Sequence, residues 1–137
     1  MRWADQLIKL SNFELELLQT RLADVVERRS LAELKLVVLT AEGEAELALA
    51  RKDPEAAWRL GAFREGLRIR KTAAQHEIDL LLTEEAGVRD ALGEAFETLK
   101  KYEHVAETSR VAEVRETARR ENAVLDEMGL RRASGRG

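Results

Sequence analysis

The sequence predicts an all-α protein, a long two-helix antiparallel coiled-coil hairpin with a C-terminal helical overhang. Three observations predict this fold. Charged residues make up 36% of the chain and aromatic residues only 4%, which is too polar for a globule with a broad core and typical of long helices. Apolar residues recur at heptad spacing in both halves of the chain. The single proline, Pro54, separates the halves, so one helix ends and another begins there.

The first helix is expected over residues 3–51. Its apolar positions are separated alternately by three and four residues, with Ser11 and Arg29 filling two of the places. They are Ile8, Leu15, Leu18, Leu22, Val25, Ala32, Leu36 and Leu39. This 3.5-residue period implies a left-handed supercoil with a partner helix. The helix would be about 74 Å long at about 1.5 Å per residue, and its stability has to come from burying the stripe.

Residues 52–54 are expected to form a corner between the helices. Asp53 can cap a helix N-terminus, and Pro54 suits the first helical position. The residue before a proline is held away from the α conformation, so the first helix cannot continue through Asp53.

The second helix is expected over residues 54–128, so that residues 1–128 form one hairpin domain, with a disordered tail over residues 129–137. Lys71 and Glu85 fall inside its apolar stripe. The stripe contains Leu67, Ala74, Ile78, Leu81, Val88, Leu92, Ala95, Leu99, Tyr102 and Ala106. Folding the chain about position 53 would pair Arg29 with Glu77 and Arg21 with Glu85. Because these polar residues then face opposite charges, we expect a monomer whose hairpin closes within one chain.

The second helix is the longer one, and residues 104–128 would extend past the N-terminus by about 37 Å. An amphipathic helix without a partner in its own chain is a candidate docking segment. Fraying of this segment, or homodimerisation through it, stays open as an alternative. The open end of the hairpin would suit the central opening of a ring-shaped partner. The candidate contact residues there are Trp3, Leu7, Leu10, Arg110, Arg115 and Arg119.

The tip of the hairpin has two open interpretations. Trp58 and Phe63 lie there beside Gly61, Gly66 and a basic cluster. Aromatic and arginine side chains are favoured in protein interfaces, so the tip could be an exposed anchor. The same aromatic rings could instead close the end of the hairpin core.

No residue pattern indicates catalysis, and we expect neither an enzyme nor a cofactor or metal. The chain has no cysteine and two histidines. The segment Gly61–Gly66 has the glycine spacing of a phosphate loop, but Leu67 and Arg68 follow where lysine and a hydroxyl residue are needed. The net charge of −3 is spread over both signs and favours neither nucleic acid nor a membrane surface. No apolar run approaches the about 20 residues of a membrane span, and no signal peptide is visible, so a cytoplasmic protein is expected.

The first helix resembles one protein family. The matching residues are Leu7-Ile-Lys-Leu10-Ser-Asn-Phe13-Glu14-Leu-Glu16, then Leu22-Ala23, Glu27-Arg28-Arg29 and Ala32-Glu33-Leu34-Lys35-Leu36. This opening, the corner near Pro54 and the pair Phe63–Leu67 resemble the flagellar export protein FliJ family. That family's fold is a two-helix antiparallel coiled coil, similar to the stalk subunit of rotary ATPases.

The resemblance implies a soluble component of the flagellar type III export apparatus. Such a protein would bind and stimulate a hexameric export ATPase, contact the membrane export gate and handle export chaperones, at the inner membrane of the flagellar base. By position, Phe63 and Leu67 would contact the gate. The family has tyrosines on the opposite helix at the positions of Thr40 and Glu44, so this chain departs from the family pattern there. Two alternatives stay open, a generic homodimeric coiled-coil scaffold and the stalk of a virulence secretion system or rotary ATPase.

Overall fold

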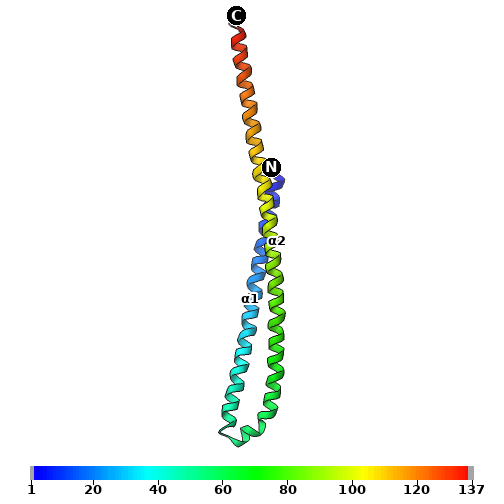
Figure 1. The fold of residues 1–137 in the computed structure, drawn as a ribbon, viewed down its shortest axis with the longest axis vertical. Helices are drawn as coiled ribbons and strands as arrows, with labels where there is room; N and C mark the ends of the chain where they lie inside the picture. The colour runs from blue at the N-terminus through cyan, green and yellow to red at the C-terminus, as the bar shows by residue number, and fades with distance from the viewer. Residues whose placement is uncertain (1, 136–137) are drawn as a thin grey trace. The chain divides into compact units, whose positions relative to one another are not determined.

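A computed structural model describes residues 2–135 of the chain. They form two α-helices, α1 (Arg2–Ala50) and α2 (Pro54–Gly135), and no strand (Figure 1). The predicted all-α helical hairpin is therefore confirmed. The chain divides into two compact units. We call Glu16–Gly93 the hairpin unit, and we call the rest, α1 through Leu15 with α2 from Glu94 onward, the terminal unit.

The corner of the hairpin unit is closed by backbone and side-chain hydrogen bonds. The amide groups of Lys52 and Asp53 both donate to the carbonyl of Leu49 at 3.0 Å, which ends α1. The carboxylate of Asp53 then accepts the amide of Glu55 at 3.0 Å, satisfying one of the free donors at the start of α2. Pro54 occupies the first helical position, where its missing amide hydrogen costs no hydrogen bond.

The core of the hairpin unit consists of the two apolar stripes facing each other. α1 buries Val25, Ala32 and Leu39, and α2 buries Leu67, Ala74, Ile78, Leu81 and Val88. One cluster joins Ala32 to Ile78 and Leu81, and the next joins Leu39 to Leu67 and Ala74. Leu36 packs against both clusters, so they form a continuous seam.

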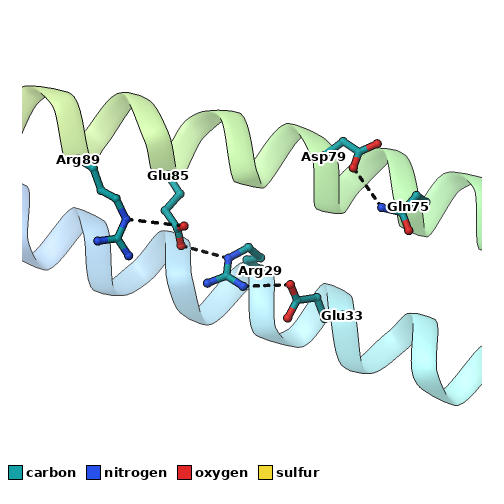
Figure 2. Close-up of polar contacts among 6 residues, drawn as sticks. All are labelled: Arg29, Glu33, Gln75, Asp79, Glu85 and Arg89. Atoms are coloured by element: carbon teal, nitrogen blue, oxygen red, sulfur yellow. Dashed lines mark hydrogen bonds and ion pairs between the residues drawn. The ribbon is translucent and has the colours of Figure 1, made fainter.

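The pairing of the two helices differs from the register predicted by folding at position 53. Arg29 Nε donates to Glu85 Oε1 at 3.1 Å, and Arg28 donates to Glu84 at 2.9 Å. The expected pairs of Arg29 with Glu77 and of Arg21 with Glu85 are therefore wrong by about one heptad. Figure 2 shows Glu85 between Arg29 and Arg89.

Two features explain this shift in register. Moving one helix by seven residues returns every apolar position to the same face, so the stripe does not distinguish one register from the next. The first turns of α2 also run across the closed end of the hairpin before the helix follows α1 (Figure 1). This wide corner uses more residues of α2 than a tight fold at position 53 would.

The terminal unit has its own short core and a long exposed continuation. Ala4, Ser11 and Leu15 are buried on α1, and Ala95 and Leu99 are buried on α2. Beyond residue 116, every residue of α2 that the structure describes is exposed.

α2 also continues through residues 129–135. The disordered tail that the sequence predicts is therefore corrected for those residues. Residues 136 and 137 lie outside the described part. An ion pair of Arg131 with Glu127 at 2.9 Å, four residues apart, supports these last turns. Across residues 2–135, neither helix has a stretch apolar and long enough to cross a membrane.

Candidate partner-binding surfaces

The six residues expected to meet a ring all lie in the terminal unit. Trp3 and Leu10 have exposed fractions of 54% and 63%. Leu7 is half-buried. Since the core positions are filled by Ala4 and Ser11, the residues directly after Trp3 and Leu10, these two side chains are left outside the core face of α1. Two large apolar side chains are thus available to a partner.

The arginines of this set are largely neutralised on their own helix. Arg110 pairs with Glu107 at 2.7 Å, and Arg119 pairs with Glu116 at 2.8 Å. The hydrogen bond from Arg110 lowers the pKa of Glu107 below its usual value, and the bond from Arg119 lowers the pKa of Glu116. Arg115 has no ion pair within 4.0 Å among residues 2–135. Of the three predicted arginines, Arg115 therefore offers the most accessible charge.

A shallow acidic hollow lies in the same unit, between the start of α1 and α2. Its volume is about 330 Å³. It is lined by Asp5 and Ile8 of α1 and by Glu103, Ala106, Glu107, Arg110 and Glu113 of α2. The sequence alone does not reveal this hollow, because the hollow depends on which residues of α2 lie beside Asp5. The surface around the predicted ring-binding residues is therefore of mixed sign rather than basic.

The two residues expected to contact a gate lie in the hairpin unit and pack inward. Leu67 is only 9% exposed and packs with Leu39 and Ala74. Phe63 is partly buried against the same cluster. A Cβ atom added to Gly43 would lie 2.5 Å from a methyl carbon of Leu67, so the glycine makes room for this leucine. Leu67 is thus a core residue, and Phe63 is the member of the pair with surface to offer.

The tip separates the two aromatic residues that the sequence could not distinguish. Trp58 is 90% exposed, whereas Phe63 closes the end of the core. Trp58 stands beside Arg59, which is also exposed. The exposed-anchor interpretation fits Trp58, and the end-of-core interpretation fits Phe63.

The positions that depart from the family's tyrosines lie on one side of α1. Thr40 and Glu44 line a shallow hollow together with Leu36, Val37 and Ala41. The hydroxyl of Thr40 donates to the carbonyl of Leu36 at 2.9 Å and is occupied by its own helix. This side of the hairpin unit therefore presents aliphatic, hydroxyl and acidic groups instead of aromatic rings.

The fold and these surfaces define a two-helix coiled-coil protein whose candidate binding groups lie on helix faces. Within residues 2–135, no group of three or more histidine and acidic side chains is placed to hold a metal ion. Comparison with known proteins gives the family. The chain is 47% identical over 133 residues to the flagellar FliJ protein of Caulobacter vibrioides, in strains NA1000 / CB15N and ATCC 19089 / CIP 103742 / CB 15.

These matches cover 97% of this chain and 96% of each relative. The chain therefore belongs to the FliJ family of flagellar proteins, which confirms the resemblance seen in its first helix. No family model matches the chain. No solved structure matches it either.

Proposed function

We propose that the protein is a component of the flagellar type III export apparatus that binds a hexameric export ATPase and stimulates it without catalysing a reaction itself. The observation that carries this proposal is the near-full-length similarity to flagellar FliJ proteins. The working place would be the cytoplasmic side of the inner membrane at the flagellar base. The export gate and export chaperones are the further partners.

The terminal unit is the part we assign to the ATPase ring. Its exposed Trp3 and Leu10 supply apolar contact area, and the charge of Arg115 supplies long-range attraction to acidic groups. Arg110 and Arg119 are already paired with carboxylates of their own helix. Binding a carboxylate of the ring instead would therefore add little to the free energy of binding. Such contacts are weak enough for a ring to change state around the helices.

The hairpin unit is the part we assign to the gate. Phe63 would touch the gate through its exposed edge, and Leu67 would support that ring from inside the core. We also propose that the protein binds export chaperones, and we assign this binding to no particular residues.

The experiment that tests the proposal measures ATP turnover by the export ATPase with added protein. We expect the full-length chain to raise the rate and a version ending at Glu103 to have no effect, provided that circular dichroism shows the shortened chain to be folded. Arg115→Glu should reduce stimulation severalfold, because it reverses the unpaired charge. Arg64→Glu, an exposed arginine in the hairpin unit, is the matched control and should leave stimulation intact. Equal stimulation by all four proteins would refute the assignment to the terminal unit.

A further inference from the structure

A second apolar stripe runs along α1 inside the hairpin unit, outside the hairpin core. Its positions are again three and four residues apart: Leu31, Leu34, Val38, Ala41, Ala45 and Ala48. We call these six residues the outer stripe. All six are exposed, with fractions of 60% at Leu31 and 57% at Leu34. At about 100° per residue, they lie nearly opposite the positions that face α2.

The sizes of the side chains in the outer stripe indicate what covers it. The three large residues come first along α1, and the three alanines follow. When two copies of α1 pack antiparallel about a two-fold axis, each large residue meets an alanine of the other copy. The three pairs are Leu31 with Ala48, Leu34 with Ala45, and Val38 with Ala41. Large side chains then fill the space above small ones, as in a well-packed core. Parallel packing would instead set leucine against leucine and leave gaps beside the alanines.

The charges flanking the outer stripe agree with the same antiparallel register. Lys35 and Glu42 are seven residues apart on one flank, and both are exposed. The positions three and four residues from Lys35 along α1 hold only apolar residues: Leu31, Ala32, Val38 and Leu39. The corresponding positions around Glu42 hold three apolar residues and one acid: Val38, Leu39, Ala45 and Glu46. Neither charge therefore has an opposite charge within reach along α1.

Neither charge has an ion pair across the hairpin. Glu77 lines the same hollow as Lys35, but no ion pair within 4.0 Å involves Lys35 or Glu42 among residues 2–135. In the antiparallel register, Lys35 comes beside Glu42 of the second copy, and the two-fold axis repeats this pair.

We propose that the outer stripe is the interface of an antiparallel homodimer of hairpins. The hairpin itself stays within one chain, and the second copy is added on the far side of α1. The stripe is about 27 Å long, which places the contact at or below the small end of specific interfaces, under roughly 1,200 Å². The dimer is therefore weak and forms only as the protein concentration rises. The monomer expected from the sequence then prevails in dilute solution. A dimer of this kind requires only a second copy of the chain and neither the ATPase nor the gate.

Sedimentation equilibrium of the full-length chain tests the dimer. We expect the average mass to rise from one chain towards two between low and high micromolar concentration. Ala45→Glu should abolish that rise, because it sets a carboxylate against Leu34 of the second copy. Ala73→Glu, an exposed alanine on α2, is the control for the added charge and should dimerise normally. A monomer at every concentration, or a dimer that Ala45→Glu leaves intact, would overturn the proposal.

Two further variants test the register. Lys35→Glu should weaken the dimer at least severalfold, and adding Glu42→Lys in the same chain should restore it, because the swapped charges attract again. The chain has no cysteine of its own, so a mixture of Leu34→Cys and Ala45→Cys chains can be oxidised. We expect the mixed disulfide to dominate. Dominant disulfides between identical chains, or no restoration by the charge swap, would show that the copies do not pair in this way.

Discussion

At the scale of single residues, one ion pair inside the coiled-coil seam decides how the two helices align. Arg29 and Glu85 occupy stripe positions that are otherwise apolar, and their side chains are only 22% and 12% exposed. Glu33 accepts a second hydrogen bond from Arg29 at 2.9 Å, and Arg89 lies 3.7 Å from Glu85 (Figure 2). A charged group at a core position favours the one register in which it meets its opposite, at some cost in stability.

Reversing the charge of Glu85 should therefore destabilise the hairpin. Glu85→Lys would place a cation between Arg29 and Arg89, and we expect thermal unfolding, followed by circular dichroism, to begin several degrees lower. Glu77→Lys is the matched control, because Glu77 is exposed and the sequence-based register would pair it with Arg29. It should change the melting temperature little. A larger effect of Glu77→Lys than of Glu85→Lys would mean that the helices pair in the register of a fold at position 53.

At the scale of elements, the corner depends on Asp53 and Pro54 together. Pro54 fixes the backbone for the first turn of α2, and the carboxylate of Asp53 satisfies the amide of Glu55 at 3.0 Å. A helix as long as α2 needs a defined start, because a shift of its first residue would move the whole apolar stripe relative to α1.

Removing this cap should cost a measurable part of the stability. Asp53→Ala should lower the free energy of unfolding by about 1 kcal/mol, the usual cost of losing a capping side chain. Asp53→Asn keeps an oxygen that accepts the same hydrogen bond and should stay within a few tenths of a kcal/mol of the original chain. Urea denaturation followed by circular dichroism measures both. Equal losses in the two variants would indicate that the charge of Asp53, and not its hydrogen bond, stabilises the corner.

The helix faces could be predicted from the sequence, because heptad spacing alone determines which side of a helix is buried. Leu67 shows how far the heptad spacing and the family resemblance each predict the position of a side chain. Its place in the stripe predicts burial, and the structure buries it, whereas the resemblance to a family placed it at a gate-binding surface. The exposure of Trp58 could not be predicted, because it depends on how the first turns of α2 cross the end of the hairpin. The acidic hollow depends in the same way on the register of the terminal unit.

At the scale of the whole molecule, the fold requires that α1 and α2 of the same chain pair with each other. The chain connecting them is only residues 51–53, so α2 is held beside α1 at a high effective concentration. Contacts between separate chains have no such advantage. Closure within one chain should therefore prevail in dilute solution over any exchange of helices between copies.

Cysteine cross-linking tests closure and register together. Ala32→Cys with Leu81→Cys places both thiols in one buried cluster, and we expect a rapid disulfide within the chain, seen as a faster-moving monomer on a non-reducing gel. Leu22→Cys with Glu84→Cys, the pair that a fold at position 53 would bring together, should react slowly. Glu84 contacts Arg28, and Leu22 lies about 9 Å before Arg28 along the helix axis. The Cα atoms of residues 22 and 84 are therefore farther apart than the about 7 Å that a disulfide can span. Faster bridging of the second pair would contradict the register, and disulfides mainly between chains at low concentration would contradict the hairpin itself.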